Sequence, residues 1–357
     1  MTDGFADILI RWYADNRRPL PWRETADPYL IWLSEVILQQ TRVAQGLDYY
    51  RRFAARFPDV RSLAEAPQDE VLKLWQGLGY YSRARSLHAA AGDIVSRFDG
   101  KFPERYEDVR SLRGVGDYTA AAVCSFAYGL PYAAVDGNVY RVLSRVFDVD
   151  LPVDDTAGKR YFAELAQSLL DAARPGLQNQ AAMEFGALQC VPQRPDCGAC
   201  PLAGHCLALA RGTVALRPVK RGKTVVQPRY FNYLFVRCNG KLLLRQRTEK
   251  DIWRNLYEFP LIETDAEAGF DALQRTSAWN AWFGGERRMR IGKRTVMPRH
   301  VLSHRIIYAC FQEIELERMP DSLPGFLQVP EAELDRYAVS RLTERYLERR
   351  YAADRNV

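Results

Sequence analysis

Four cysteines near the middle of the chain restrict its local folding more strongly than any other feature. Cys190, Cys197, Cys200 and Cys206 have the spacing C-x6-C-x2-C-x5-C within seventeen residues. The C-x2-C pair offers two sulfurs from one tight turn and the longer arms supply the other two, so the four thiolates can close around one metal centre. We therefore expect this segment to fold as a compact loop around a metal site.

The spacing favours an iron–sulfur cluster but leaves zinc open. Structural zinc sites usually present two short knuckles, whereas this segment has one short pair. Disulfides fit poorly, because the cysteines number seven and the chain begins without the charged and apolar regions of a secretion signal. The remaining cysteines stand in apolar runs and are expected in the core. They are Cys124, Cys238 and Cys310.

Composition indicates a globular chain with more than one domain. Its 357 residues suffice for two or three domains, and no apolar run is long enough to span a membrane. A net charge of +6 permits a polyanionic partner. Residues 211–229 carry six basic residues, two prolines and no acidic residue. We predict domains over 1–211 and 230–357, joined by a basic linker over 212–229, although a merely solvated connector fits this stretch equally well.

The two halves of the chain have different periodicities. Upstream of the linker, apolar residues recur at intervals of three and four between proline and glycine breaks, which predicts a mostly helical domain. Downstream, short β-rich runs joined by turn signals such as Asn239-Gly240 predict an α+β domain with a helical tail from about residue 339. The expected strands cover residues 230–237, 241–245, 258–262 and 301–315.

A Gly-Val-Gly segment precedes one of the expected helices. Gly114 and Gly116 let the backbone turn sharply before a helix that begins near Asp117. The amides of that helix start would face outward as an anion site, which on a nucleic acid would hold one phosphate without reading sequence. Most such glycine pairs are only turns, so this prediction depends on the residues around it.

Two carboxylates upstream of the cysteines have contrasting surroundings. A helix starts at Asp27 and Pro28, and most neighbours of Glu35 on that helix are apolar, so desolvation should raise the pKa of Glu35. Asp136 directly precedes another helical pattern, where amide donors and the helix dipole favour the anion. Considered alone, Glu35 is explained as well or better as a structural buried glutamate, and Asp136 as a structural N-cap. Together, an acid and an anion can cleave bonds through oxocarbenium-like transition states.

The hairpin, an aspartate about twenty residues later and the cysteine quartet, in this order, resemble the helix-hairpin-helix DNA glycosylase superfamily, which includes endonuclease III. The resemblance implies a 4Fe-4S cluster on the four cysteines, a segment over 190–206, and a helix-hairpin-helix at about 104–128. Within the superfamily the chain is similar to the MutY branch, the adenine DNA glycosylases. The similar segments are LPWR (20–23), SEVILQQTRV (34–43), GLGYYSRAR (77–85) and DGNVYRVLSR (136–145).

One position separates the branches of this superfamily. Bifunctional relatives carry a Schiff-base lysine two residues after the second hairpin glycine, where this chain has Tyr118. Without that amine the enzyme has no route to a covalent imine with the sugar. The resemblance thus implies a monofunctional glycosylase that leaves an abasic site. In it, Glu35 would protonate adenine, Asp136 would stabilise or attack the sugar cation, and Tyr118 and Asn138 would line the catalytic pocket.

The resemblance also implies residues that contact the DNA. Trp22 and Arg23 would lie along the wall that receives adenine after it is turned out of the base stack. Gln40 and Tyr80 would wedge into the helix near the lesion, although the adjacent Tyr81 could exchange roles with Tyr80. The chain departs from the family at two positions. Arg113 replaces the usual hairpin proline, and Gln180 replaces a glutamate that some relatives carry near the adenine, which puts an ionised contact there in doubt.

The segments WRNLYEFP (253–260) and RHVLSH (299–304) resemble the C-terminal domain of the same family, which is similar in fold to Nudix hydrolases. No REx2EE-like string for binding metal ions occurs between 230 and 357, so we expect this domain to recognise a lesion rather than hydrolyse a nucleotide. In the family a Phe-Ser-His loop probes 8-oxoguanine. Here Leu302 replaces the aromatic ring, while Ser303 and His304 remain, so hydrogen bonding is expected to survive without stacking. His304 fits a satisfied loop histidine equally well.

The expected function is excision of adenine paired with 8-oxoguanine, and also with guanine, from double-stranded DNA. The protein is expected to act as a monomer in the bacterial cytoplasm, without membrane association, and the sequence does not identify its protein partners. Three alternatives stay open: an endonuclease III-like glycosylase/lyase on oxidised pyrimidines, a non-catalytic damage-binding or redox-responsive iron–sulfur protein, and a Nudix-type nucleotide hydrolase. Tyr118 and the second domain argue against the lyase, and the missing metal-binding helix argues against the hydrolase.

Overall fold

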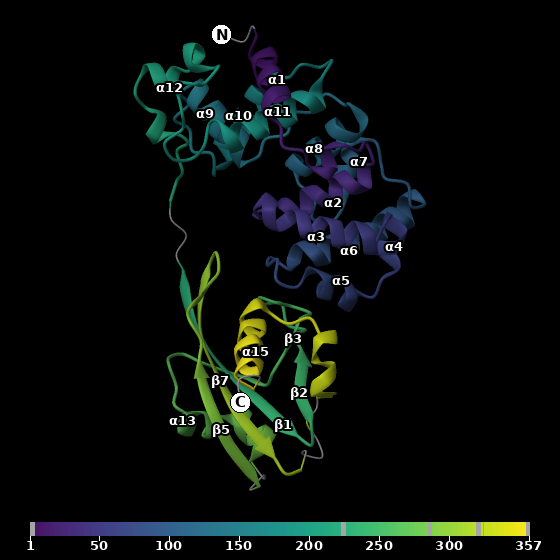
Figure 1. Ribbon diagram of the computed structural model, residues 1–357, viewed down its shortest axis with the longest axis vertical. Coiled ribbons are helices and arrows are strands. Elements are labelled where there is room, and N and C mark those ends of the chain that lie inside the picture. Colours follow the sequence, from purple (N-terminus) through teal and green to yellow (C-terminus); the bar gives the residue numbers. More distant parts are fainter. Residues whose placement is uncertain (1–3, 223–225, 285–287, 319–322, 324, 355–357) are drawn as a thin grey trace. The chain divides into compact units, whose positions relative to one another are not determined.

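The computed structural model describes residues 4–222, 226–284, 288–318, 323 and 325–354 (Figure 1). The chain forms two compact units. Unit 1 comprises Met1–Glu65 and Ser86–Gly222, and unit 2 comprises Ala66–Arg85 and Lys223–Val357. The predicted helical first half and α+β second half are confirmed. The grouping of the early helical segment Ala66–Arg85 with unit 2 was not anticipated by any linear division of the sequence.

Unit 1 is built from helices joined by short loops. Two helices start where the sequence predicts, because Asp27 and Asp136 each accept hydrogen bonds from the amides of the first turn that follows. The helices of unit 1 are α1 (Phe5–Asn16), α2 (Pro28–Leu38), α3 (Val43–Arg56), α4 (Val60–Glu65), most of α6 (Ser82–Phe98), α7 (Tyr106–Ser111), α8 (Asp117–Tyr128), α9 (Gly137–Val146), α10 (Thr156–Ser168), α11 (Pro175–Leu188) and α12 (Leu207–Ala210), with 3-10 turns η1 (Pro21–Arg23), η2 (Ala203–His205) and η3 (Val214–Leu216).

Small side chains let the central helices of unit 1 approach one another closely. In α8, residues from Thr119 to Ser125 are buried, and most of them are alanine or another small residue. This helix contacts both α2 and α11. A separate core forms where α1, α9, α10 and α11 meet, around Leu9, Val142, Phe162 and Phe185. As a consequence α2, α8, α9 and α11, which are far apart in sequence, bring their polar residues to one place.

Unit 2 is a twisted sheet with apolar clusters on both faces. Alternate residues of β1 belong to different clusters: Tyr233 and Phe235 pack with α15, while Leu234 and Val236 pack with α13 and α14. The strand order is β3-β2-β1-β7-β5, with β1 and β7 parallel. The strands are β1 (Gln227–Cys238), β2 (Lys241–Gln246), β3 (Tyr257–Glu258), β4 (Leu261–Thr264), β5 (Met289–Val296), β6 (His300–Val301), β7 (Arg305–Leu316) and β8 (Leu327–Pro330), and the helices are α5 (Gln68–Trp75), α13 (Phe270–Gln274), α14 (Ser277–Phe283) and α15 (Arg341–Asp354), with the 3-10 turn η4 (Glu331–Arg336).

The predicted strands are present but differ in detail. The Asn239-Gly240 hairpin is confirmed, and both residues have positive φ, 46° and 70°, as a type I′ turn requires. The run predicted over 258–262 is divided between β3 and β4 at Phe259 and Pro260. Strands β5 and β8 were missed. In β5, three of the eight residues are basic, most side chains are exposed, and burial does not alternate along the strand. Among the described residues, no helix has the length and apolar character needed to cross a membrane.

The first part of the expected linker, up to Gly222, belongs to unit 1. Thr213 donates a hydrogen bond to Asp148 at 2.6 Å, and Arg217 forms an ion pair with the same carboxylate at 2.9 Å. Arg221 pairs with Asp155 at 3.6 Å. The charge of these arginines is therefore partly neutralised within unit 1 rather than left for a polyanion. The domain boundaries given by the sequence stay predictions.

Candidate active site

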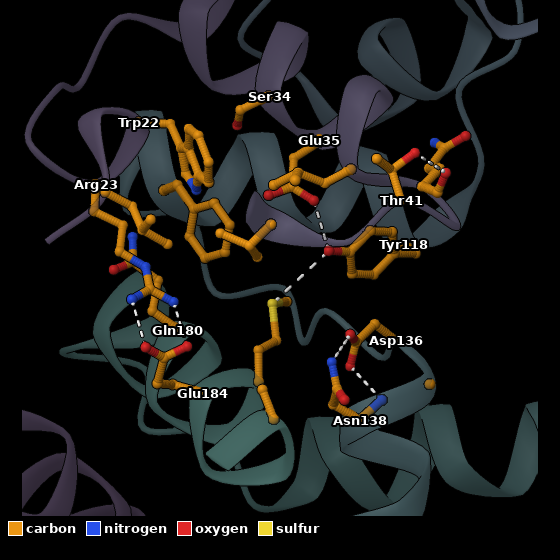
Figure 2. A pocket seen from close by; sticks show the side chains of 18 of the residues that line it. Trp22, Arg23, Ser34, Glu35, Thr41, Tyr118, Asp136, Asn138, Gln180 and Glu184 are labelled. Atoms are coloured by element: carbon orange, nitrogen blue, oxygen red, sulfur yellow. Dashed lines mark hydrogen bonds and ion pairs between the residues drawn. The ribbon is translucent and has the colours of Figure 1, made fainter. Parts of the chain in front are cut away.

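A pocket of about 550 Å³ opens in unit 1 between η1, α2, α8, α9 and α11 (Figure 2). It gathers side chains that are more than 160 residues apart in the chain, including a glutamate from α2 and an aspartate that caps α9. Seven of the residues proposed from the sequence line it: Trp22, Arg23, Glu35, Gln40, Tyr118, Asp136 and Asn138.

Glu35 is buried in the pocket wall and bonded to Tyr118. The Tyr118 hydroxyl donates a hydrogen bond to Glu35 Oε2 at 2.5 Å and also lies 3.7 Å from Met183 Sδ. Burial raises the pKa of Glu35 to about 7; the hydrogen bond from Tyr118 opposes this rise, and the negative charge of Asp136 adds to it. The elevated pKa expected from the sequence is confirmed, so a proton is available on Glu35 near neutral pH.

The position of that proton follows from the donor. Burial and the neighbouring carboxylates raise the pKa of Tyr118 well above its ordinary value, so its hydroxyl stays protonated and acts as a donor. The carbonyl oxygen of a carboxylic acid is a better acceptor than its hydroxyl oxygen, so the hydrogen bond from Tyr118 to Oε2 favours Oε1 as the site of a proton carried by Glu35. The hydrogen bond thus favours one of the two oxygens for a transferable proton.

Asp136 is the N-cap of α9, as predicted. Its Oδ1 accepts from the amides of Asn138 at 2.9 Å and Val139 at 2.8 Å, and its Oδ2 accepts from the Asn138 side-chain amide at 2.7 Å. Despite these donors, burial raises the pKa of Asp136 above its ordinary value. The donors considered in the sequence reasoning do lower the pKa of Asp136, but the sequence could not show the loss of solvent at this cap, which has the larger effect.

Arg141 connects this cap to the cysteine segment. Its guanidinium donates to the Asn138 side-chain oxygen at 2.8 Å, to the Gly186 carbonyl at 2.7 Å and to the Cys190 carbonyl at 2.8 Å. Asp136 is therefore joined through two side chains to the backbone of the first predicted cluster ligand. Sequence reasoning missed Arg141, although its place one turn after Asn138 on α9 was a usable signal.

Arg23 is held by a glutamate that the sequence analysis did not identify. Glu184 is fully buried on α11 and accepts paired hydrogen bonds from Arg23, at 2.9 and 2.8 Å, and from Arg18, at 2.9 and 2.5 Å. Burial by itself would raise the pKa of Glu184, but the bonds from Arg18 and Arg23 together lower it to about 2. The Trp22 ring beside Arg23 is buried and meets Tyr50 edge to face at 5.2 Å.

Gln180 lines the same pocket one turn before Glu184 on α11. Its side-chain oxygen accepts a hydrogen bond from the Tyr13 hydroxyl at 2.8 Å. The family's glutamate is thus replaced by a neutral amide whose orientation is fixed by a tyrosine from α1. The ionised carboxylate at this pocket wall comes from Glu184 instead, and it is engaged by the two arginines.

The two residues predicted to wedge into DNA each have a strained backbone conformation. Gln40 has φ 55° and Tyr80 has φ 48°, in the left-handed region that side chains other than glycine rarely occupy. Both are exposed. Of the two adjacent tyrosines, Tyr80 is 48% exposed, whereas Tyr81 is 4% exposed and donates to the Val339 carbonyl. Exposure favours Tyr80 for the predicted contact with DNA, which stays a prediction.

Within unit 2, Tyr80 belongs to a second pocket, of about 470 Å³. Its hydroxyl lies 2.8 Å from the hydroxyl of Ser303, which occupies the exposed turn between β6 and β7. His304 follows in the same turn and is also exposed. Leu302, which replaces the family's aromatic residue, is partly buried against the core of unit 2 and is not presented as a stacking surface.

The hairpin glycines differ in what they require. Gly114 has φ 79°, and a Cβ there would lie 2.6 Å from the Ser86 side chain, so both backbone and space demand glycine. Gly116 has ordinary negative φ and open space around it, and it caps α8 without a side-chain hydrogen bond. The first amides of α8 are thus left without a side-chain cap, as the predicted phosphate site needs. The phosphate contact itself stays a prediction.

The four cysteines of the predicted cluster line one small cavity. In the described parts of the chain, no three histidine, cysteine, aspartate or glutamate side chains stand close enough to share a single metal ion. A four-iron cluster is larger than one ion and takes one thiolate at each iron, so the quartet fits a cluster better than mononuclear zinc. Burial raises the pKa of Cys200 to about 11, so its thiolate needs a positive partner such as iron. The other cysteines are buried in the cores, as predicted.

Three family models match the chain in sequence order. Residues 33–168 match the HhH-GPD superfamily of base excision DNA repair proteins, residues 190–206 match the iron–sulfur binding domain of endonuclease III, and residues 232–349 match the NUDIX domain. The expected fold class is confirmed. The 4Fe-4S cluster is confirmed as the cofactor, in place of zinc.

Two relatives with similar sequences are adenine DNA glycosylases. The adenine DNA glycosylase of Buchnera aphidicola subsp. Acyrthosiphon pisum is 32% identical over 265 residues, covering 74% of this chain and 76% of the relative. The human adenine DNA glycosylase is 44% identical over 217 residues, covering 58% of this chain and 40% of the relative.

Two solved structures are similar to the helical part of the chain. A thermostable thymine-DNA glycosylase matches with a TM-score of 0.55 and 28% identity, over 59% of this chain and 97% of that protein. A non-covalent endonuclease III–DNA complex matches with a TM-score of 0.51 and 22% identity, over 58% of this chain and 94% of that protein. The second likeness supports the fold alone.

Proposed function

The chain belongs to the adenine DNA glycosylases of the HhH-GPD superfamily, and we propose that it excises adenine paired with 8-oxoguanine, and also with guanine, from double-stranded DNA. The proposal rests chiefly on one observation. A tyrosine, Tyr118, occupies the place of a Schiff-base lysine and donates to the buried Glu35, in a pocket that also contains Asp136. This constellation provides an acid and a carboxylate for hydrolysis but no amine for a lyase step.

Glu35 is proposed as the general acid. With a pKa of about 7 it is close to half protonated at neutral pH. Its proton on Oε1 passes to a ring nitrogen of adenine, and the electron pair of the glycosidic bond leaves with the base. Protonation makes adenine a neutral leaving group and leaves a cation on the sugar. The Tyr118 hydroxyl keeps its own proton and stabilises the Glu35 carboxylate that results.

Asp136 is proposed to meet the sugar cation. Its carboxylate stabilises the developing positive charge at C1′ or attacks it, and Asn138 fixes the carboxylate's orientation through Oδ2. Water then supplies hydroxide to C1′ and returns a proton to Glu35, which restores the enzyme and leaves an abasic site. A pKa raised by burial fits a carboxylate that is stabilised more strongly when a cation forms beside it than in the empty pocket.

The wall around Trp22 and Arg23 is proposed to receive the adenine. Because the glycosidic bond is inaccessible within the duplex, the base must be turned out of the stack into a pocket. Trp22 offers a fixed aromatic surface to the base. The paired hydrogen bonds to Glu184 hold the Arg23 side chain in one orientation along the pocket wall. Gln40 and Tyr80, whose strained backbone fits a functional role, are proposed to fill the space in the duplex near the lesion.

Recognition of 8-oxoguanine is assigned to unit 2. Ser303 stands in an exposed turn, and its hydroxyl and that of Tyr80 can both donate and accept hydrogen bonds. The partly buried Leu302 leaves hydrogen bonding rather than stacking as the means of recognition at this turn. A Nudix-type hydrolase is disfavoured, because residues 230–357 contain no REx2EE-like string whose carboxylates could bind metal ions.

The test is base release from defined duplexes by the purified protein. We expect free adenine from A:8-oxoguanine and more slowly from A:G, none from A:T, and strand breakage only after treatment with alkali or heat. Strand breakage without that treatment would indicate a lyase. If no adenine were released while the duplex is still bound, the non-catalytic damage-binding alternative would be favoured.

A further inference from the structure

A second arginine of α9 lies inside the cysteine segment. The Arg145 side chain donates to the carbonyls of Val191 at 2.8 Å and Pro192 at 3.0 Å, and one of its terminal nitrogens lies 3.4 Å from Cys190 Sγ. The Arg145 carbonyl in turn is 3.4 Å from Cys206 Sγ. Side chain and backbone of one residue thus contact two of the four predicted ligands.

The same guanidinium also binds the segment that follows the cysteines. Its Nε donates to the carbonyls of Val214 at 3.1 Å and Arg217 at 3.3 Å. These residues begin the stretch whose Thr213 and Arg217 side chains contact Asp148. Arg145 therefore ties the ligand loop and the segment after it to α9.

Within the described part of the chain, the charge of Arg145 has no carboxylate partner. Arg145 is 2% exposed, and no ion pair joins it to an aspartate or glutamate of the described residues. A buried charge is costly unless it is compensated by an opposite charge as well as by hydrogen bonds. Four thiolates around a 4Fe-4S core of charge +2 carry a net charge of about −2. Among the described contacts of Arg145, those with Cys190 and Cys206 place the cluster as its opposite charge.

We propose that Arg145 is a positioning residue for the cluster, supplying its buried counter-charge and holding the ligand loop closed. Arg145 would act through the bonds above rather than by binding iron. The inference rests on ligation by the four cysteines, and iron in the wild-type protein tests that premise by itself. The alternative is a purely structural arginine that supports the backbone and leaves the properties of the cluster unchanged.

Two variants separate charge from geometry. Arg145→Gln removes the charge and most of the donors, and should lose iron to a chelator at least about tenfold faster than wild type, since hydrogen bonds from charged groups are among the strongest. Arg145→Lys keeps the charge but cannot span the same carbonyls, so it should also lose iron faster. Arg160→Gln is the matched control, because that arginine is 79% exposed on α10 and should behave as wild type.

The reduction potential gives a readout that backbone support alone would not change. When the resting cluster gives one electron to an electrode, its net charge becomes less negative. A nearby cation therefore stabilises the reduced form and raises the potential. Arg145→Gln should shift the midpoint to more negative values, whereas Arg145→Lys should keep it near that of wild type.

Each outcome has one meaning. An iron-containing wild type together with a folded Arg145→Gln variant, checked by circular dichroism, that matches it in iron loss and midpoint overturns the inference alone. A folded wild type without iron overturns the cysteine ligation and the inference with it. If Arg145→Gln does not fold, Arg145→Lys decides: wild-type iron loss, or a shifted midpoint, overturns the inference. Faster iron loss by Arg145→Lys with an unshifted midpoint supports the inference, whereas an unshifted midpoint in a folded Arg145→Gln variant overturns the role of Arg145 as a counter-charge.

Discussion

The hydroxyl of Tyr118 donates a hydrogen bond to Oε2 of Glu35 at 2.5 Å. The two residues lie on α8 and α2, which pack closely because the buried residues of α8 are small. In the proposed mechanism, the tyrosine that stands where bifunctional relatives carry a lysine offers no amine nucleophile and orients the proposed acid. A lysine there would carry a positive charge beside Glu35 and favour its carboxylate, whereas a neutral hydroxyl leaves the pKa near neutrality.

The first prediction concerns the pH dependence of base release. Because Glu35 is needed in its protonated form and has a pKa of about 7, single-turnover adenine release should be fastest below pH 7 and fall as the pH rises through it. Glu35→Gln keeps the size but has no transferable proton, and should slow release by about 100-fold or more at all pH values. Quench-flow measurement of free adenine across this range tests both statements.

Duplex binding by the same variant shows whether a slower reaction reflects lost chemistry or lost affinity for DNA. Gel-shift affinity of Glu35→Gln for A:8-oxoguanine duplex should stay within a few-fold of wild type, because Glu35 is buried and little of it faces the DNA. A Glu35→Gln protein that binds normally and still releases adenine at the wild-type rate would remove Glu35 from the role of acid.

Tyr118→Phe tests the orientation of the acid. The hydrogen bond from Tyr118 lowers the pKa of Glu35, so its loss should raise that pKa and move the decline in rate to higher pH. The proton would no longer be favoured on one oxygen, and the rate at low pH should fall by about tenfold, the equivalent of about 1.4 kcal/mol. An unchanged pH profile would show that the bond does not influence the acid during the reaction.

Sequence reasoning found residues that line the pocket of unit 1 better than it found the residues that hold them in place. Glu35, Tyr118 and Asp136 stand in motifs with local signals: a cap, an apolar helix face and a glycine hairpin. Glu184 and Arg141 stand in ordinary helical stretches, and their importance comes from contacts with residues distant in sequence. Local periodicity carries no information on such contacts.

The same limit applies to electrostatics and to the sheet. The pKa of Glu35 could be predicted because its neighbours on α2 are apolar, whereas that of Asp136 depends on the pocket walls from other helices. Strand β1 was recognised because both of its faces are buried and its apolar run is continuous. The exposed edge strand β5 presents a basic surface, which gives no strand signal in a single sequence.

Arg141 provides a third prediction. Arg141→Leu removes the donors to Asn138 and to the Cys190 carbonyl, so Asn138 should no longer hold the Asp136 carboxylate in place. We expect base release to slow by about tenfold to 100-fold, the cost of one or two charge-assisted hydrogen bonds. Single-turnover rates should be normalised to iron content, so that a loss of cluster is not mistaken for a slower reaction. A variant with full iron and the wild-type rate would contradict this role.

The Glu184 pair with Arg18 and Arg23 predicts a dependence of stability on pH. The pKa of Glu184 is about 2 in the folded protein, below its ordinary value of 4.5, so its contribution to the free energy of unfolding is complete above pH 4.5 and lost as the pH falls toward 2. The shift corresponds to a contribution of about 3 kcal/mol. Urea unfolding should show Glu184→Gln less stable than wild type at pH 7 and the difference shrinking toward pH 3. A constant difference would mean that the pair does not act through its charge.

Ser303→Ala tests how unit 2 distinguishes the two mispairs. Removing the hydroxyl leaves the turn between β6 and β7 intact but deletes a hydrogen-bonding group beside Tyr80. We expect adenine release from A:8-oxoguanine to slow about fivefold to tenfold, as the loss of one neutral hydrogen bond predicts, and release from A:G to change little. The ratio of single-turnover rates on the two duplexes is the measurement.

His304→Ala serves as the comparison, because a satisfied loop histidine would leave the ratio unchanged. Equal slowing on both duplexes by Ser303→Ala would assign the serine to general DNA binding instead of lesion recognition.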